Sequence, residues 1–335
     1  MKVAVFSTKS YDREYLDKYL QEKHTVEYFE SALKQRTVGL TNGFDAVCVF
    51  VNDTLDAEVI KRISENGVRL IVLRCAGFNN VDLEAAREYG MRVLRVPAYS
   101  PHAVAEHAVA LIMTLNRKTH KAYNRVREGN FSIERLTGFE LSGKTVGVIG
   151  TGRIGKIFAE IMRGFGCQII AHDAYINADL EKQGVQYMDM ETVFKQSDIL
   201  SLHCPLTPET HHMINAESLL KMKKGVMLIN TSRGKLIDTN AAIQSLKDGH
   251  LGYMGLDVYE QEEALFFKDL SEIIIRDDKI ARLMTFHNVL ITAHQAYFTD
   301  NALDQIAKTT CKNIDDFCAG SIQKENEVTA ERVLG

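Results

Sequence analysis

The chain lacks the features that define several large classes of protein. It contains no run of about 18 apolar residues, the length that a membrane-spanning helix needs. The N-terminus carries only a short apolar run, which is more typical of a first β-strand than of a secretory signal. A net charge of −4 and a pI of about 6.3 argue against a broad basic face for nucleic acid. We therefore expect neither a membrane nor a nucleic-acid partner.

Typical patterns of disulfide formation and metal binding are absent as well. The six cysteines include no CxxC pair, and no spacing of histidine with cysteine or aspartate suggests a zinc site. Without a secretory signal, free thiols in a reducing cytoplasm are the better interpretation. The sequence thus predicts a cytoplasmic protein that holds no metal ion.

What the chain does contain is an alternation of strand and helix patterns. Its 335 residues exceed one ordinary domain, and 45% apolar with 25% charged residues is typical of a soluble protein with sizeable cores. Helix patterns such as 55–66 and 83–89 separate the strands, so we expect an α/β fold with two doubly wound parallel sheets. The expected strands are 2–6, 46–51, 70–74 and 92–96 in a first series, and 145–149, 168–172, 199–203, 226–230, 255–258 and 289–292 in a second.

A long helix separates the two series. Ser100 is a good N-cap and Pro101 a good first helical residue, and an apolar helix pattern continues to about Arg117. We expect the chain to cross into a second domain along this helix. A further helical pattern at 299–320 is expected to return to the first domain.

A glycine-rich turn follows the first strand of the second series. Gly150 permits a tight turn, Gly152 lets the backbone approach a pyrophosphate, and Gly155 allows the helix to pack closely on the strand. The next strand ends in Asp173, 18 positions after Gly155, where a carboxylate can bind ribose hydroxyls and repel a 2′-phosphate. The pattern favours NAD over NADP as cofactor. The alternative is a glycine turn that serves only helix packing.

Polar residues follow later strands of this series, at the edge where a doubly wound sheet binds its ligands. Arg233 follows the fourth strand, Glu262 the fifth and His294 the sixth. An arginine can hold a carboxylate through two parallel bonds, a histidine can donate a proton near neutral pH, and a glutamate can orient the imidazole. Together they suit hydride transfer from a nicotinamide to a 2-oxo acid. Taken singly, each charged residue could be solvated and the histidine structural.

Additional cofactor contacts are expected in the glycine turn and after the third and fourth strands. These candidates are Arg153, Ile154, Cys204, Pro205 and Thr231. Arg153 is equally well interpreted as a solvated charge.

The sequence resembles the D-isomer-specific 2-hydroxyacid dehydrogenase family over nearly its whole length, and within that family it is similar to the bacterial fermentative D-lactate dehydrogenases. The family's catalytic arginine, glutamate and histidine match Arg233, Glu262 and His294. Some relatives that oxidise formate carry no glutamate at this position, so Glu262 argues against that activity. The stretches that carry the resemblance are RCAGFNNVDL, VPAYSPHAVAEHA, VIGTGRIG, LHCPLTPETHHMIN, NTSRG, DVYE and HQA.

The resemblance implies the remaining parts of the site. Backbone N–H groups of Ala76 and Gly77 would bind the substrate carboxylate, and Asp257 would lie near the nicotinamide carboxamide. Three aromatic residues would wall the side-chain pocket and favour pyruvate over bulkier acids; they are Phe50, Tyr99 and Tyr297. Related enzymes often carry phenylalanine where Tyr297 stands, so the substrate preference stays open.

The resemblance also implies a domain arrangement and a partner. Residues 1–100 and 298–335 would form a substrate-binding domain, and residues 101–297 an NAD-binding domain, both Rossmann-like, with the active site in the cleft between them. The long helix that starts at Pro101 would lie in the interface of a homodimer, or of a dimer of dimers.

Three functions are compatible with these observations. The first is a D-lactate dehydrogenase that reduces pyruvate with NADH. The second is a reductase for glyoxylate, hydroxypyruvate or a larger 2-oxo acid. The third is an NAD-sensing binding protein that keeps the fold without turnover, against which the intact Arg233, Glu262 and His294 argue.

Overall fold

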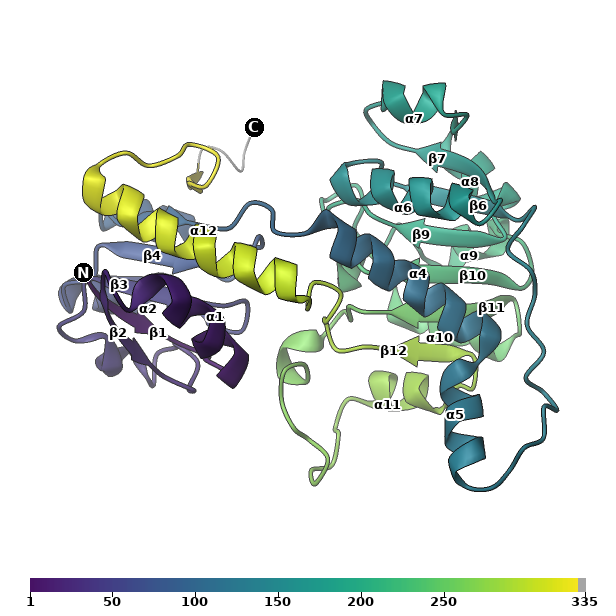
Figure 1. The fold of residues 1–335 in the computed structure, drawn as a ribbon, viewed down its shortest axis with the longest axis horizontal. Coiled ribbons are helices and arrows are strands. Elements are labelled where there is room, and N and C mark those ends of the chain that lie inside the picture. Colours follow the sequence, from purple (N-terminus) through teal and green to yellow (C-terminus); the bar gives the residue numbers. More distant parts are fainter. Residues whose placement is uncertain (331–335) are drawn as a thin grey trace. The chain divides into compact units, whose positions relative to one another are not determined.

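The computed structural model describes residues 1–330, and the chain divides into two compact units (Figure 1). Unit 1 contains residues 1–100 and the described chain from Phe298 onward, and unit 2 contains Pro101–Tyr297. Each unit is built around its own sheet. Every described helix is too short or too polar to span a bilayer.

Unit 1 is a parallel sheet of five strands with helices on both faces. Its strands are β1 (Lys2–Val5), β2 (Thr25–Tyr28), β3 (Ala46–Val49), β4 (Leu70–Leu73) and β5 (Arg92–Leu94). Its helices are α1 (Ser10–Leu20), α2 (Ala57–Glu65), α3 (Leu83–Glu88) and α12 (Asp300–Ala319), with a 3-10 turn η1 (Val38–Thr41). The strand order is β2-β1-β3-β4-β5.

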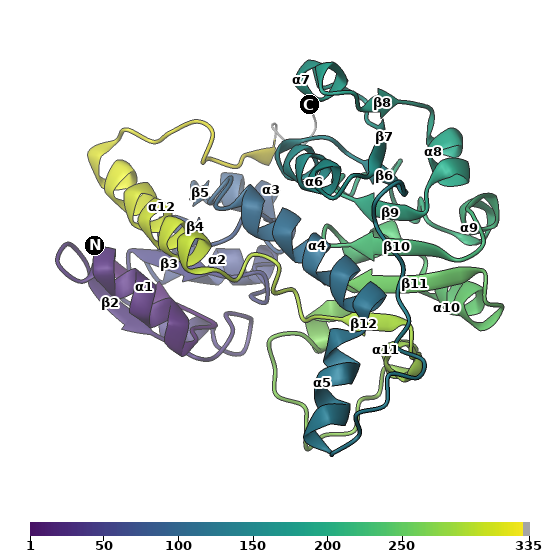
Figure 2. The same cartoon turned by 45° about the vertical axis from the view of Figure 1, so that its right-hand side comes forward.

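The two faces of this sheet are buried against different helices. Val3 of β1 packs in one apolar cluster with Leu16 of α1 and Ile314 of α12. Ala4, the next residue of β1, packs in another cluster with Ile60 of α2. Because successive side chains of a strand point to opposite faces, α1 and α12 cover one face while α2 and α3 cover the other (Figure 2).

Unit 2 is a larger sheet of the same type. Its strands are β6 (Thr145–Ile149), β7 (Gln168–His172), β8 (Gln186–Tyr187), β9 (Ile199–Leu202), β10 (Val226–Asn230), β11 (Leu251–Leu256) and β12 (Val289–Ile291). Its helices are α4 (Pro101–Arg117), α5 (Thr119–Arg127), α6 (Arg153–Gly164), α7 (Ala178–Lys182), α8 (Met190–Gln196), α9 (Ala216–Lys221), α10 (Thr239–Lys247) and α11 (Asp278–Thr285), with 3-10 turns η2 (Gly234–Leu236) and η3 (Glu262–Ala264). All neighbouring strands pair in parallel, in the order β12-β11-β10-β9-β6-β7-β8.

Two cores stabilise unit 2, one on each face of its sheet. Helices α4 and α6 pack on one face, with Ile112 and Phe158 fully buried against strand residues such as Val148. Helices α9, α10 and α11 pack on the other face. The polar groups of the site lie at the strand ends, outside both cores, where loops leave this buried scaffold.

The predicted fold class is confirmed, because both sheets are parallel and doubly wound. The helix predicted from Pro101 to about Arg117 is α4. The helical pattern at 299–320 is α12, whose first turn is capped by Thr299 and whose end is capped by Gly320 at φ +68. For α4 and α12, local capping signals and apolar periodicity were sufficient to predict the helix.

Other predicted boundaries need correction. The sequence predicts neither β2 nor β8, which are edge strands with partly exposed residues and therefore lack a continuous apolar run. The strand predicted at 255–258 is β11, which starts at Leu251 and ends at Leu256. Its first half was obscured by Gly252, since glycine weakens a strand pattern.

Candidate active site

The glycine-rich turn lies where the strand order of unit 2 reverses. β6 pairs with β7 on one side and with β9 on the other, and ligands bind at such a switch point. Gly150 has φ +90, and a Cβ there would lie 2.7 Å from the backbone N of Cys204. A Cβ on Gly152, in contrast, would meet nothing within 4 Å. The turn is therefore packed against the β9 loop at Gly150 and open at Gly152, as the approach of a pyrophosphate requires.

The start of α6 and the end of β7 complete this part of the site. Among the described residues, no side chain caps the N-terminus of α6, which leaves its first N–H groups to an anion. Asp173 accepts hydrogen bonds from Thr151 N and Oγ1 and from Tyr175 N. Burial alone would raise the pKa of Asp173, but these bonds outweigh burial and hold the pKa below its usual range. The carboxylate is thus ionised at neutral pH, which fits ribose hydroxyls better than a 2′-phosphate.

The turn after β10 presents Arg233. The buried side chain of Asn230 accepts a hydrogen bond from Ser232 N at 3.0 Å and donates one to Arg233 O at 2.8 Å. Ser232 Oγ also donates to Cys204 O at 2.6 Å, which ties this turn to the one after β9. The Arg233 side chain is exposed in unit 2, and its Nη1 donates to Ser232 O at 2.7 Å. A rigid turn therefore carries a guanidinium with further donors to offer.

Thr231 lies in the same turn, and its hydroxyl is buried. Among the described residues, Thr231 Oγ1 has no hydrogen-bond partner. A buried hydroxyl without a partner is costly, so it fits a place where a ligand supplies the missing polar group.

Gly234 follows Arg233 for a reason that the sequence does not reveal. Its φ is not in the left-handed region, so a tight turn is not what requires glycine. A Cβ there would lie 2.1 Å from the carbonyl carbon of Tyr259 and 2.4 Å from the backbone N of Glu260. Gly234 therefore lets the Arg233 turn lie directly against the backbone of the loop after β11, which carries Glu262.

Asp257 organises the turn after β12. It is fully buried, its Oδ1 accepts from Thr292 Oγ1 and Gln295 N, and its Oδ2 accepts from Ala296 N. His107 of α4 lies 3.4 Å from Oδ1. Burial would raise the pKa of Asp257, but the bonds from His107, Thr292 and Ala296 outweigh burial and lower it. A buried carboxylate thus stays charged and holds the turn in one conformation.

His294 sits in this turn and pairs with Glu262. Nδ1 of His294 lies 2.8 Å from Oε1 of Glu262, whose Oε2 accepts from Tyr259 N at 2.9 Å. His294 has φ +55, a costly conformation for a residue other than glycine, and its backbone N donates to Asp257 O at 2.7 Å. Engagement of Nδ1 leaves Nε2 as the nitrogen that can exchange a proton with a substrate.

The three predicted catalytic residues follow three neighbouring parallel strands, β10, β11 and β12. Arg233, Glu262 and His294 therefore belong to one edge of one sheet, the edge that also carries the glycine turn. Cys204 and Pro205 lie at this edge after β9, and Arg153 and Ile154 in the first turn of α6.

The residues predicted to contact substrate lie on loops of both units. In unit 1, Phe50 follows β3 and the Ala76–Gly77 stretch follows β4, so both lie at the carboxyl edge of its sheet. Ala76 O accepts from Arg95 Nη1 at 2.9 Å, which fixes this loop. Tyr99 precedes α4 in unit 1, and Tyr297 is buried near the end of unit 2.

Several residues that hold these loops were missed by the sequence analysis. His107, Thr292 and Asn230 are buried or half-buried polar residues on apolar elements, which was the only available signal. In unit 1, Arg74 is 2% exposed, donates to Asp12 Oδ1 at 3.2 Å, and lies 5.1 Å from the Phe50 ring centroid. His107, Thr292 and Arg74 act through partners that are distant in sequence, so no local pattern marks them, whereas Asn230 bonds within its own turn.

Comparison with known proteins agrees with this architecture. A family model described as the NAD binding domain of D-isomer specific 2-hydroxyacid dehydrogenases matches residues 109–296, more than half of the chain. The chain is 53% identical over 337 residues to 2-hydroxyacid dehydrogenase A of Aspergillus oryzae, covering 98% of this chain and 97% of that protein. It is 51% identical over 321 residues to D-lactate dehydrogenase of Escherichia coli K12, covering 96% and 98%. A solved D-lactate dehydrogenase of Aquifex aeolicus, complexed with NAD and lactic acid, has a TM-score of 0.87 at 36% identity, covering 98% and 99%.

A doubly wound sheet with a glycine turn and an ionised aspartate at its switch point defines an NAD-binding domain of the dehydrogenase type. With the full-length similarities, the chain belongs to the D-isomer specific 2-hydroxyacid dehydrogenase family and uses NAD as its cofactor. It is an NAD-dependent D-2-hydroxyacid dehydrogenase, as the resemblance in its motifs predicts.

Proposed function

We propose that this protein is a D-lactate dehydrogenase, which reduces pyruvate with NADH and oxidises D-lactate in reverse. The observation that carries the proposal is the His294–Glu262 pair at 2.8 Å, at the same sheet edge as Arg233 and the glycine turn. The similarity to proteins named D-lactate dehydrogenase supports pyruvate as the substrate.

In this proposal the three residues have separate tasks. Arg233 binds the substrate carboxylate through two parallel bonds and polarises the carbonyl. His294 donates the proton on Nε2 to the carbonyl oxygen, and Glu262 holds Nδ1 so that Nε2 faces the reaction. In the reverse direction, neutral His294 accepts the hydroxyl proton of D-lactate.

The cofactor contacts are part of the proposal. NAD, when bound, supplies the hydride donor or acceptor at its nicotinamide ring. The open turn at Gly152 and the uncapped start of α6 would hold the pyrophosphate, and Asp173 the adenosine ribose. Asp257 would lie beside the carboxamide. The other proposed contacts are Gly150, Arg153, Ile154, Gly155, Cys204, Pro205 and Thr231.

Five residues are proposed as substrate contacts. Backbone N–H groups of Ala76 and Gly77 would bind the carboxylate, and Phe50, Tyr99 and Tyr297 would limit the space for the side chain. The test is steady-state kinetics with NADH and a series of 2-oxo acids, with chiral analysis of the product. We expect pyruvate to have the highest kcat/KM and to give D-lactate. Formation of the L-isomer, or a clear preference for glyoxylate, hydroxypyruvate or a larger acid, would overturn the assignment.

We further propose a cytoplasmic homodimer, or a dimer of dimers. All six cysteines are free thiols, which suits a reducing compartment. Helix α5 buries none of its residues within the chain, and the segment after it exposes Phe131 to 74% and Ile133 to 82%. Exposed apolar side chains of this size are typical of an interface. Analytical ultracentrifugation should give a dimer or tetramer for the wild type, and Phe131→Asp should weaken it; a monomeric wild type would contradict the proposal.

A further inference from the structure

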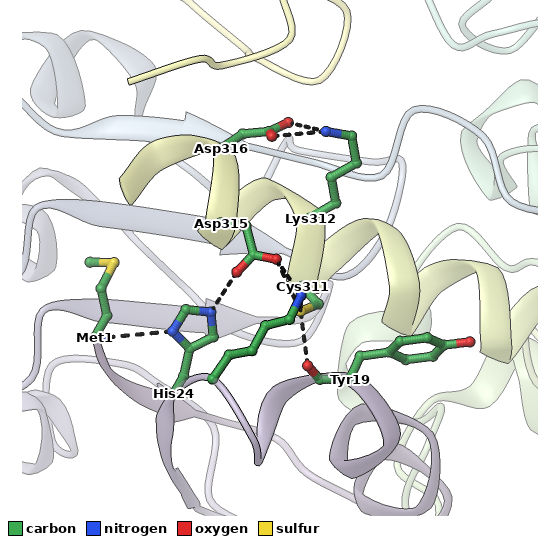
Figure 3. A network of polar contacts seen from close by, with 8 residues as sticks. Met1, Tyr19, His24, Cys311, Lys312, Asp315 and Asp316 are labelled. Atoms are coloured by element: carbon green, nitrogen blue, oxygen red, sulfur yellow. Dashed lines mark hydrogen bonds and ion pairs between the residues drawn. The ribbon is translucent and has the colours of Figure 1, made fainter. Parts of the chain in front are cut away.

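A cluster of three side chains of types that can ligate a metal ion lies in unit 1, away from the residues proposed for catalysis. His24 stands in the turn between α1 and β2, and Cys311 and Asp315 lie one helical turn apart on α12 (Figure 3). His24 directly precedes β2, at the amino edge of the parallel sheet, whereas Phe50 and Ala76 follow strands at its carboxyl edge. The cluster therefore has no part in the proposed reaction.

The spacing of its donor atoms suits a small tetrahedral ion. One donor atom from each of the three side chains lies within 4.8 Å of the other two. His24 Nε2 is 3.0 Å from Asp315 Oδ1, and Cys311 Sγ is 3.8 Å from Asp315 Oδ2. Zinc bonds of about 2.0–2.3 Å place neighbouring donors of a tetrahedral site roughly 3.3–3.5 Å apart. Only small side-chain movements would therefore bring these donors around an ion.

A cation already occupies the neighbourhood of these donors. Lys23 Nζ lies 2.7 Å from Asp315 Oδ2 and 4.0 Å from Cys311 Sγ. The Lys23 side chain is 55% exposed, so it can withdraw into water at little cost. His24, in contrast, is 5% exposed at its side chain and Cys311 is buried, so two donors are held in place by packing.

Solvent has access to the cluster. A surface hollow of about 460 Å³ is lined by residues that include Met1, Lys23 and His24. Of the three ligands only His24 lines this hollow, but the Asp315 side chain is itself 35% exposed, so a hydrated ion can reach the cluster from solvent and a water molecule can serve as a further ligand.

We propose that His24, Cys311 and Asp315 form a binding site for Zn²⁺ that links the turn after α1 to helix α12. A thiolate, an imidazole and a carboxylate are the ligand types that zinc prefers, and the two anionic ligands neutralise its charge. On binding, the S–H bond of Cys311 breaks and its proton leaves to solvent, Lys23 swings away, and His24 gives up the proton that Nε2 shares with Asp315 and carries one on Nδ1 instead, so that the Nε2 lone pair faces the ion. The ion would clamp two segments that lie far apart in the sequence and so stabilise unit 1.

Zinc titration of the purified full-length protein, against a competing chromophoric chelator, tests this site. We expect one Zn²⁺ per chain and a rise in Tm with zinc for the wild type. Cys311→Ser and Asp315→Asn keep the size of the side chains and should weaken binding by at least about 100-fold, since even second-shell losses cost about 10- to 100-fold. The matched control is Cys318→Ser, because Cys318 is an exposed thiol on the same helix. This control should bind zinc and gain Tm as the wild type does.

Two further variants make the result decisive. Lys23→Met removes the competing ammonium and should bind zinc more tightly than the wild type, whereas weaker binding would contradict the proposal. His24→Gln should lose zinc while kcat with NADH and pyruvate stays at the wild-type value, which separates this site from the proposed activity. Absence of saturable binding in the wild type, or equal affinity in Cys311→Ser, would overturn the assignment.

Discussion

Replacement of Gly234 by alanine tests how the Arg233 turn is tied to the loop that carries Glu262. The added Cβ would lie 2.1 Å from the carbonyl carbon of Tyr259 and 2.2 Å from its oxygen. Carbon atoms in contact are normally about 3.5–4.0 Å apart, so one of the two backbones must move by more than about 1 Å. The atoms in the way belong to the main chain and cannot rotate aside.

This displacement should affect substrate turnover more than cofactor binding. A misplacement of about 1 Å in a catalytic arrangement can cost about 100-fold in rate, and we expect kcat/KM for pyruvate to fall by that order. The crowding itself should destabilise the fold by about 1–3 kcal/mol. The proposed pyrophosphate and ribose contacts belong to the turn between β6 and α6 and to the end of β7, so the Kd for NADH, followed by fluorescence titration, should rise by much less than kcat/KM falls, even though Thr231 lies in the displaced turn.

Gly164→Ala is the matched control for this experiment. Gly164 is the last residue of α6, and a Cβ there would meet nothing within 4 Å. Alanine is the better helix former, so this variant should keep full activity and stability. Circular dichroism must show that Gly234→Ala is folded at the assay temperature. A folded variant with near-normal kcat/KM would refute the argument that the close approach at Gly234 sets the position of Arg233.

Three further substitutions probe the same edge of the sheet. Arg233→Lys keeps the charge but cannot form two parallel bonds to a carboxylate, so kcat/KM for pyruvate should fall about 10- to 100-fold. Near-normal kinetics would instead indicate that Arg233 is only a solvated charge in the turn. Glu262→Gln removes the anion that faces His294, so kcat should fall while the Kd for NADH is unchanged, and an unaltered kcat would remove Glu262 from the mechanism. Asp257→Asn should cost about 1–3 kcal/mol in urea unfolding at neutral pH, because an amide cannot accept at both Oδ positions. The pKa of Asp257 is lowered in the folded protein, so its carboxylate stabilises the fold above the unfolded-state pKa of about 3.9, and this stabilisation is lost as pH falls through the folded-state pKa. The difference in unfolding free energy between the Asn variant and the wild type should therefore narrow below about pH 4. A constant gap down to pH 3 would contradict this role.

Features encoded by neighbouring residues were predictable from the sequence. Pro101 at the start of α4 and Gly320 at the end of α12 are local signals, and both helices have the predicted course. The same holds for the placement of the glycine turn between β6 and α6. The edge strands β2 and β8 gave no such signal, because a strand with partly exposed residues looks like a loop.

The candidate site likewise has one part that the sequence predicts and another part that it does not. Strand ends in a parallel sheet share one edge, so the order of strands and polar residues was enough to group Arg233, Glu262 and His294. Nothing local indicated that Asp257 would gather Gln295, Ala296 and Thr292 around its carboxylate, because those partners come from the next strand and its turn.

The proposed zinc site also lies beyond what local sequence patterns can indicate, and the expectation of no metal ion stays a prediction. Zinc motifs are recognised in sequence when their ligands are close together, and His24 is separated from Cys311 and Asp315 by almost the whole chain. Only the packing of α1 and α12 on one face of the unit 1 sheet brings them together. The close approach at Gly234 has the same cause at the candidate active site. Tyr259 is remote in sequence, yet its carbonyl carbon and oxygen would lie within 2.2 Å of a Cβ on Gly234. The spacing of residues along the chain therefore indicates a site only where secondary structure alone sets the distance between its residues. Elsewhere, tertiary packing determines which residues meet.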